Sequence, residues 1–240
     1  MAVQKGTGAG SNLRAFYIVL AVVAIAGIAM VGNAVLGGSG SAATAPVELE
    51  GIEDARRLYD LATPVVMGDP SAPVKIVEFG DYQCPGCGAF ATRVKPQIKA
   101  RYVDTGQAQF VFYDFPLTEI HPHSFLAARA ARCAGDQDRF WDYHDVVFAR
   151  QGSWSYARTA PIEQFTGYAT ELGLDAGAFQ ACLESDAHAE AVTANRKLGE
   201  QLGVNATPTL IIDNRRISNP LDIQAVGAVI EESMQSEAGV

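Results

Sequence analysis

Two cysteines, Cys84 and Cys87, follow a short apolar run, and this junction constrains the fold more than any other feature of the sequence. The run, VKIVEF at residues 74–79, is rich in β-branched side chains, which is typical of a buried strand. Residues 84 to about 101 predict a helix, and Pro96 is expected to bend it. The cysteine pair is therefore predicted to lie where a strand passes into the first turn of a helix.

The remaining segments predict a mixed α/β arrangement. A second strand is expected at residues 108–115, followed late in the chain by a strand at 209–212, a tight turn into a brief strand near Ile217 and a closing helix at 221–234. Helical patterns lie between them at 122–133, 140–150, 162–172, 175–183 and 186–202. This order predicts a central mixed sheet flanked by helices, with an all-helical subdomain inserted at about 117–202.

An uncharged apolar run occupies residues 15–36. About 20 apolar residues suffice to cross a bilayer as a helix, so the run is predicted to be a transmembrane anchor. Lys5 and Arg14 precede it, which predicts that the chain after the anchor lies outside the cytoplasm. Small residues follow the run, so a cleaved signal peptide, which would make the protein secreted, stays open. The expected parts are a cytoplasmic N-terminus (1–14), the anchor (15–36), an extracytoplasmic linker (37–63) and a folded domain (64–237).

Charge and cysteine usage narrow the functional classes. The net charge of −9 offers no basic surface for nucleic acid. An exported domain would lie in an oxidising compartment, where disulfides persist. The cysteines to be interpreted in that setting are Cys84, Cys87, Cys133 and Cys182.

The spacing of Cys84 and Cys87 suits reversible disulfide chemistry. Side chains at i and i+3 of a helix have β-carbons about 5–6 Å apart, and a disulfide needs about 4 Å, so a modest adjustment lets the bond form and break. Cys84 would lie at the helix N-terminus, where unpaired N–H groups and the helix dipole stabilise a thiolate. Pro85 suits the first helical position because its missing N–H would be unpaired there. We expect Cys84 to be the nucleophile and Cys87 the more shielded resolving thiol.

Other uses of the pair are less well supported by the sequence. A structural zinc site needs four ligands, and the remaining cysteines and histidines do not form a matching second half. A two-thiolate Cu(I) site stays open. A permanent disulfide across so short a loop would contribute little stability. Redox exchange is favoured, and it needs no metal or other cofactor because the cysteines carry the electrons.

The segment VEFGDYQCPGCGAF resembles the active-site segment of the DsbA-like thiol:disulfide oxidoreductases, a family of the thioredoxin superfamily. Two later segments, FPLTEIHPHSFLAARAARCAG and FWDYHDVVF, resemble the start of the inserted helical domain of that family, and GVNATPTLII resembles its cis-proline loop. The resemblance covers about residues 67–234. It implies a thioredoxin fold with a helical insertion, and an enzyme that introduces disulfide bonds into exported proteins.

The same resemblance implies roles for further residues. It implies a cis peptide bond between Thr207 and Pro208, facing the cysteines and contacting the substrate backbone together with the intervening residues Pro85 and Gly86. It also identifies Glu78 as the acid beneath the active site. A buried acid has a raised pKa and could relay a proton to or from the second cysteine, whereas a strand-end glutamate that reaches solvent is the alternative.

The resemblance also bears on the second cysteine pair and on partners. Some members of the family carry a second disulfide in the insert, so a structural bridge between Cys133 and Cys182 is favoured over two free thiols. The implied partners are exported proteins with free cysteines and a membrane reoxidase. Pro85 and Gly86 supply no side-chain donor to the thiolate, which leaves the oxidising strength open. A reductase or isomerase, and a non-catalytic Cu(I)- or protein-binding module, are the alternative functions.

Several polar residues near these motifs have ordinary structural explanations. Asp81 and Tyr82 precede the cysteine pair, where shaping a substrate groove and a purely structural role are equally compatible with the sequence. A structural role is favoured for all four histidines, which are His121, His123, His144 and His188.

Overall fold

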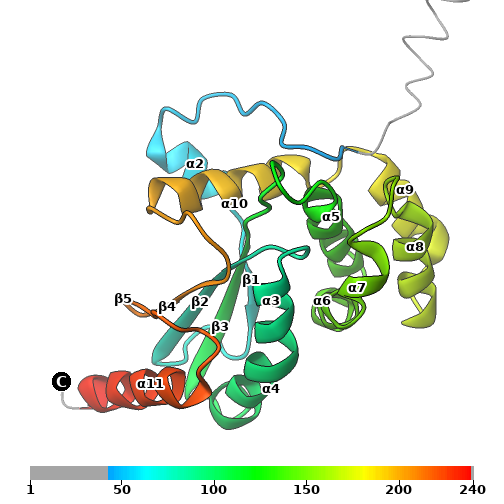
Figure 1. Ribbon diagram of the computed structural model, residues 1–240. Coiled ribbons are helices and arrows are strands. Elements are labelled where there is room, and N and C mark those ends of the chain that lie inside the picture. The colour runs from blue at the N-terminus through cyan, green and yellow to red at the C-terminus, as the bar shows by residue number, and fades with distance from the viewer. Residues whose placement is uncertain (1–42, 239–240) are drawn as a thin grey trace, which may run out of the picture. The chain divides into compact units, whose positions relative to one another are not determined.

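The computed structural model describes residues 43–238 and contains a five-stranded sheet with helices packed on it (Figure 1). The strands are β1 (Val65–Met67), β2 (Val74–Gly80), β3 (Ala108–Asp114), β4 (Thr209–Ile212) and β5 (Arg215–Arg216), in the spatial order β1-β3-β2-β4-β5. The β2 and β3 strands are parallel, and the other three pairings are antiparallel. The predicted mixed sheet is therefore confirmed.

The central strand β2 presents different residues to the two faces of the sheet, because side chains alternate along a strand. Val74, Ile76 and Glu78 point to one face, where the apolar pair packs into the main core. Phe79 points to the opposite face and packs there with Phe115 in a second apolar cluster. Glu78 is thus the acidic member of a row that is otherwise apolar.

The first face is covered by the helical segment after β2 and by the C-terminal helix α11 (Ile223–Ala238). The segment after β2 consists of α3 (Pro85–Ala89), a π-helical turn (Phe90–Val94), α4 (Lys95–Ile98) and a second π-helical turn (Lys99–Val103). The Lys95 N–H donates to the Phe90 carbonyl, five residues back. The expected bend near Pro96 thus coincides with a π turn immediately before it, which is a common cause of helix bending.

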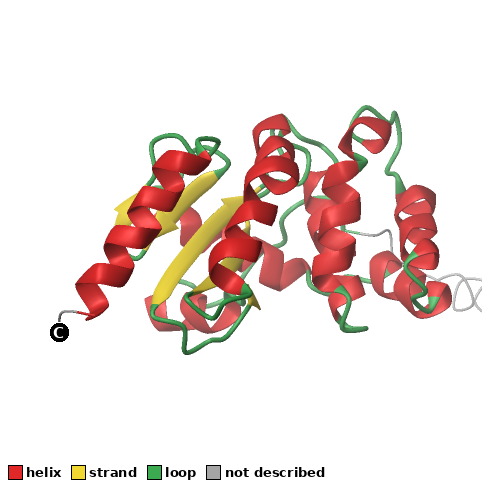
Figure 2. Cartoon of the chain, turned by 90° about the horizontal axis from the view of Figure 1, so that it is seen from below, coloured by secondary structure: helices red, strands yellow, loops and turns green. Residues whose placement is uncertain are grey.

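Most of the inserted helices lie beside the sheet and its covering helices (Figure 2), and the last of them crosses the second face of the sheet. They are α5 (Ser124–Gly135), α6 (Phe140–Ala149), α7 (Gln151–Trp154), α8 (Ile162–Glu171), α9 (Ala176–Glu184) and α10 (Ala189–Gln201). A buried ion pair between Arg132 of α5 and Asp114 at the end of β3, at 2.6 Å, connects the insert to the sheet. The α10 helix returns across the second face, where a β-carbon on Gly199 would lie 2.7 Å from Phe115, so only glycine fits this approach.

The described part of the predicted linker at 37–63, residues 43–63, packs against the rest of the folded unit. The helix α2 (Ala55–Leu61) buries Leu58 against Ala194 of α10. The Val47 N–H donates to the Thr193 hydroxyl at 3.1 Å. Residues 43–63 therefore belong to the same compact unit as the expected domain at 64–237, which extends farther toward the N-terminus than predicted. The apolar residues of this stretch show no regular hydrophobic period along the sequence. Their packing depends on α10, which is distant in sequence.

Two short elements were absent from the sequence prediction. The β1 strand pairs antiparallel with β3, with Val65 opposite Phe112, but it is short and lies in a segment rich in turn residues. The α7 helix is one turn long and ends at the buried Trp154. The α10 helix begins later than expected because His188 adopts a left-handed conformation (φ 63°), which interrupts the helical path immediately before Ala189.

Within residues 43–238, no helix combines the length and apolarity that a membrane span requires. The predicted transmembrane anchor at 15–36 and the cytoplasmic N-terminus at 1–14 lie outside the described residues.

Candidate active site

Cys84 and Cys87 lie at the start of α3, with both thiols free. Cys84 is the N-cap residue in an extended conformation (φ −71°, ψ 123°), and Pro85 is the first helical residue. The Cys84 N–H donates to the Asp81 carbonyl at 3.1 Å, and the Cys84 carbonyl accepts from the Gly88 N–H at 3.0 Å. The pair therefore sits at the junction of loop and helix, where unpaired N–H groups face the first sulfur.

The two thiols differ in exposure and acidity. Cys84 is partly exposed, and its pKa is lowered to about 5, first by a hydrogen bond from the Cys87 side chain and then by the backbone N–H groups of Cys87 and Gly86, against the effect of its burial. Cys87 is fully buried, and this burial raises its pKa well above the ordinary value. The Asp81 N–H donates to the Cys87 sulfur at 3.4 Å. One thiolate faces the surface and one thiol is kept neutral behind it.

Glu78 lies beneath the pair and is fully buried, so the solvent-reaching alternative does not describe it. Neither of its carboxyl oxygens has a hydrogen-bond partner among the described residues. Burial raises the pKa of Glu78 to about 8, and the positive charge of Lys95 opposes this effect only in part. Glu78 is therefore protonated at neutral pH. Its charge, when present, also raises the pKa of Cys87, so the two groups interact.

The cis-proline loop lies against the cysteine pair. The Thr207–Pro208 peptide bond is cis. The Cys84 thiol donates to the Thr207 carbonyl at 3.4 Å, so loop and sulfur are in direct contact. A β-carbon on Gly86 would lie 3.2 Å from Pro208 Cδ and 3.7 Å from Cys84 Sγ. Glycine at this position therefore leaves room for the proline.

Asp81 and Tyr82 are both buried, and their contacts indicate structural roles. One Asp81 carboxylate oxygen accepts from the Gln83 N–H at 2.7 Å. The other accepts from the Leu117 N–H at 2.8 Å and lies 2.7 Å from His121 Nδ1. The Tyr82 ring stacks on Phe148 of α6, with centroids 4.7 Å apart. Neither residue forms the surface of a groove.

Two glutamines that the sequence did not single out connect the insert to the active-site loop. The Gln151 side-chain amide of α7 donates to the Tyr82 carbonyl at 2.7 Å and to the Cys84 carbonyl at 2.9 Å. The Gln83 amide donates to the Ser155 carbonyl at 2.6 Å, and the Gln83 side-chain oxygen accepts from the His123 N–H at 2.8 Å. These contacts join residues far apart in the chain, so no local sequence pattern predicts them.

The four histidines have different surroundings. His123 Nε2 lies 2.8 Å from the Ala157 carbonyl, and His188 Nε2 lies 2.8 Å from the Asp136 carboxylate, away from the redox pair. His144 is fully buried among aromatic rings, and burial lowers its pKa to about 3. The His121 ring lies within hydrogen-bonding distance of the active-site loop, at Asp81, whereas His123 reaches the loop through its backbone N–H and His144 packs edge-on against Tyr82.

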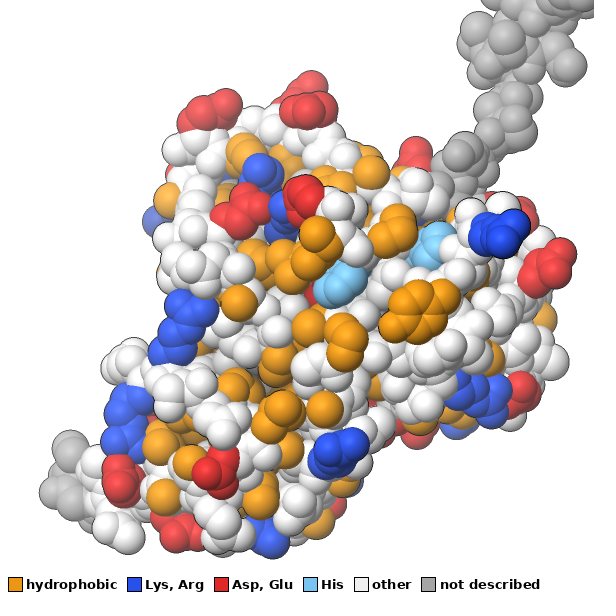
Figure 3. Space-filling view, viewed as in Figure 1, with side chains coloured by type: hydrophobic (Ala, Val, Ile, Leu, Met, Phe, Trp, Pro, Cys, Tyr) orange, Lys and Arg blue, Asp and Glu red, His pale blue; other side chains and the backbone are white. Residues whose placement is uncertain are grey.

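Apolar side chains gather across the face that carries the start of α3 (Figure 3). A cavity of about 420 Å³ opens there, lined by Pro85 of the redox motif, by Gln151 and by Ile120, His121 and Tyr156 of the insert. Tyr156 is 86% exposed and Ile120 is 69% exposed. Such a concentration of exposed apolar side chains is typical of a surface that binds another molecule.

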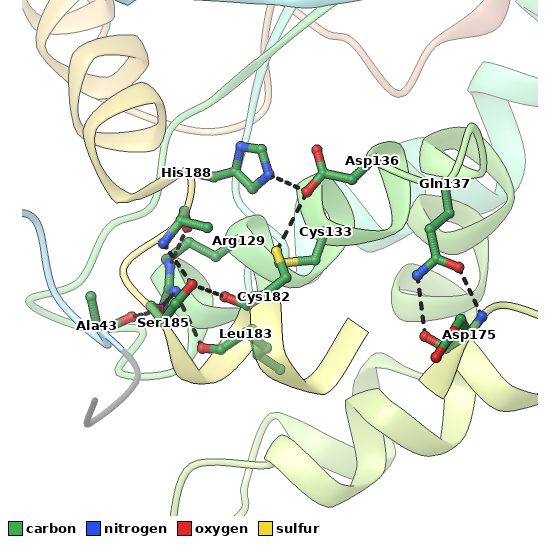
Figure 4. Close-up of a disulfide and its surroundings, with 11 residues drawn as sticks. Ala43, Arg129, Cys133, Asp136, Gln137, Asp175, Cys182, Leu183, Ser185 and His188 are labelled. Carbon is green, nitrogen blue, oxygen red and sulfur yellow. Dashed lines mark hydrogen bonds and ion pairs between the residues drawn. A yellow bond between two sulfur atoms is a disulfide. The ribbon is translucent and has the colours of Figure 1, made fainter. Parts of the chain in front are cut away.

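The second cysteine pair forms a disulfide between α5 and α9 (Figure 4). The Cys133 and Cys182 sulfurs are bonded, with Cα atoms 5.8 Å apart. Beside the bond, the Arg129 guanidinium donates to four backbone carbonyls, those of Ala43, Leu183, Ser185 and Ala187. A ring nitrogen of His188 also lies within 4.8 Å of the two sulfurs, but sulfurs bonded to each other are not thiolate ligands, so this cluster is not a metal site in the oxidised protein.

Comparison with known proteins gives consistent matches. The family model described as Thioredoxin matches residues 60–232. The crystal structure of oxidised BdbD from Bacillus subtilis is 28% identical, with a TM-score of 0.64, and the alignment covers 71% of this chain and 92% of that one. The crystal structure of alpha-DsbA1 from Wolbachia pipientis is 25% identical, with a TM-score of 0.63, and covers 72% of this chain and 92% of that one.

A further similarity is to part of a larger protein. The chain is 34% identical over 179 residues to the Na(+)/H(+) antiporter NhaA 1 of Salinispora arenicola (strain CNS-205). The alignment covers 72% of this chain and 26% of the antiporter. The chain thus spans about a quarter of the length of that relative.

Proposed function

The chain belongs to the thioredoxin family and, within it, to the DsbA-like thiol:disulfide oxidoreductases, and from this premise we propose that it introduces disulfide bonds into exported proteins. The observation that carries the proposal is the contrast between Cys84, with a pKa lowered to about 5, and the fully buried Cys87. A stabilised thiolate is a good leaving group and favours the reduced state of the enzyme, so the oxidised enzyme is a strong oxidant of client dithiols.

The reaction proceeds by two exchanges. A client thiolate attacks Cys84 Sγ of the oxidised pair, the bond between the two enzyme sulfurs breaks, and the Cys87 sulfur leaves and takes up a proton. A second client thiolate then attacks the client sulfur of the mixed disulfide and releases Cys84 as a thiolate. The client loses two electrons and becomes a disulfide, and the enzyme gains both electrons. The cis-proline loop lies directly beside Cys84 and Gly86. A client sulfur that reaches Cys84 therefore brings its backbone close to Thr207 and Pro208 on one side and to Pro85 and Gly86 on the other.

Glu78 is proposed to donate the proton that Cys87 needs as its sulfur leaves. Its pKa of about 8 makes the protonated form dominant below pH 8, and the charges of the two groups interact. We expect Glu78→Gln to slow client oxidation at pH 7 by about 10- to 100-fold, since general acid catalysis contributes on this order or more. Because the donor form is lost as pH rises through 8, the ratio of wild-type to variant rate should fall toward one above that pH. Stopped-flow oxidation of a dithiol peptide between pH 6 and 9.5 measures both rates. A ratio of wild-type to variant rate that does not change with pH would refute the proton relay.

The direction of the reaction is tested by the reduction potential of the pair. We expect a value well above the roughly −270 mV of thioredoxin, because the Cys84 thiolate stabilises the reduced form. Equilibration of the full chain with glutathione buffers, followed by alkylation and mass spectrometry, measures it. A potential near that of thioredoxin would favour the reductase or isomerase alternative and contradict the proposed oxidase.

The proposed location is the extracytoplasmic side of the cell membrane, with residues 15–36 as anchor and Lys5 and Arg14 on the cytoplasmic side. This placement agrees with an oxidase, since disulfides form in oxidising compartments. A membrane reoxidase would accept the two electrons from the reduced pair. Labelling of Cys84 by a membrane-impermeant maleimide, after reduction of intact cells with a membrane-impermeant phosphine, tests the placement, and protection until lysis would contradict it.

A further inference from the structure

His121 is joined to both redox cysteines through a single residue, Asp81. The Asp81 carboxylate is buried and lies 2.7 Å from His121 Nδ1. The backbone of the same residue contacts both cysteines, since its carbonyl accepts from the Cys84 N–H at 3.1 Å and its N–H donates to Cys87 Sγ at 3.4 Å. The imidazole is therefore held in a fixed position relative to the pair.

The other partners of Asp81 make this position rigid. Its two carboxylate oxygens also accept the N–H groups of Gln83 and Leu117, at 2.7 and 2.8 Å. The first of these belongs to the loop before Cys84, and the second belongs to the connection that leads to His121. Both ends of the bridge from loop to insert are thus fixed by backbone hydrogen bonds to the same carboxylate.

His121 lies beside the active site and not behind it. Its side chain is 15% exposed, and together with Pro85 it lines the cavity of about 420 Å³ on the active-site face. Its pKa is raised, chiefly by the hydrogen bond to Asp81 against the effect of burial, and further by the charges of Asp81 and Cys84. Glu119, the nearby acid in sequence, is paired with Arg196 at 2.7 Å. The charges acting on the imidazole are therefore those of Asp81 and Cys84.

We propose that His121, held by Asp81, is a positioning residue of the redox site whose positive charge stabilises the Cys84 thiolate. The dipeptide Pro85-Gly86 carries no cation or side-chain donor, so the insert supplies a cation from outside the motif. This inference rests on the proposed use of Cys84 as the exchanging thiolate. It deepens that function by assigning part of the oxidising strength to the insert.

The proposal couples the charge of His121 to the redox state. Reduction by a client dithiol breaks the enzyme disulfide, leaves a thiolate on Cys84 and a protonated thiol on Cys87, and transfers two electrons from the client, which releases two protons and becomes a disulfide. The thiolate exists only in the reduced enzyme. By linkage, a cation that stabilises the thiolate must itself hold its proton more tightly in the reduced enzyme than in the oxidised one.

The first experiment titrates Cys84 in the reduced full-length chain, by the rate of alkylation with iodoacetamide between pH 3 and 9. We expect His121→Gln, which keeps a donor for Asp81 and removes the charge, to reduce the acidity of Cys84 about three- to tenfold. The equilibrium constant for client oxidation should fall by the same factor, and a tenfold change corresponds to 29.6 mV. His188→Gln is the matched control, since it removes a histidine paired with the distant Asp136. An unchanged Cys84 titration in His121→Gln overturns the proposal.

A second measurement uses the wild-type chain and does not depend on the folding of a variant. The pKa of His121, followed by NMR of its ring, should be higher in the reduced than in the oxidised protein, while that of His188 should not change. Equal His121 values in both states would overturn the inference. The outcomes also separate the two proposals. An ordinary pKa for Cys84 in the wild type would contradict the proposed oxidase. A Cys84 thiol that is acidic in the wild type and equally acidic in His121→Gln would contradict only this inference.

Discussion

A Cys87→Ser variant is expected to remain covalently attached to its clients and to lose disulfide transfer down to the background level. The Cys84 thiolate of the variant still attacks a disulfide in a client, and a mixed disulfide forms with no net oxidation. The serine hydroxyl does not displace the client as the Cys87 thiol would, so the adduct persists. Purification of the full chain under acid-quenched, non-reducing conditions and mass spectrometry of the adducts measures the result, and exported proteins should dominate.

The matched control for this experiment is Cys84→Ser. Its remaining active-site sulfur, Cys87, is 0% exposed, and burial raises its pKa, so we expect few adducts. If both variants captured clients equally, the division of roles between the two cysteines would be wrong. If neither captured any, a non-catalytic binding module would become the better account.

Removal of the second disulfide, in a Cys133→Ala/Cys182→Ala variant, is expected to lower the free energy of unfolding by about 4 kcal/mol. The bond links residues separated by 49 positions, and the chain-entropy model gives this magnitude for a loop of that size. We also expect the acidity of Cys84 to be unchanged, because the bond lies between α5 and α9, away from α3. Urea unfolding monitored by circular dichroism measures the first quantity, and alkylation kinetics the second.

A Cys84→Ala/Cys87→Ala variant, unfolded under the same conditions, is the control for loss of a disulfide that closes only a short loop. We expect a much smaller change in its free energy of unfolding, since the closure entropy depends on loop length. A loss of less than about 1 kcal/mol on removing the Cys133–Cys182 bond would show that the reduced chain is already restrained by other contacts, such as those of Arg129.

The elements that carry their own pattern could be predicted from the sequence. The β2 and β3 strands begin at the predicted residues, 74 and 108, because each is a run of β-branched and aromatic side chains. The helices α6 and α8 likewise begin at residues 140 and 162, as predicted. In contrast, β1 is stabilised by its antiparallel pairing with the edge of β3, and α2 is held by the packing of Leu58 against Ala194 of α10. Stability of this kind comes from a partner distant in sequence and leaves no local periodicity.

The active site shows the same division. Helix position and residue type could suggest why Cys84 is acidic, and the alternation of β2 leads to the burial of Glu78. The contacts of Gln151 and Gln83 with the loop, and that of His121 with Asp81, join segments between 40 and 72 residues apart. No spacing rule predicts them. A structural role was assigned to His121 from sequence, and only its contact with Asp81 connects it to the redox pair.

The close approach of Gly86 to Pro208 limits how this protein can be re-engineered. The dipeptide between the cysteines tunes the stability of the thiolate, but a β-carbon at position 86 would lie 3.2 Å from Pro208 Cδ. The cis-proline loop would then have to shift by a few tenths of an ångström, and the surface proposed to bind clients would shift with it. A designer who wants a stronger or weaker oxidant has more freedom at the rim of the neighbouring cavity, where charge can be added or removed without moving the backbone.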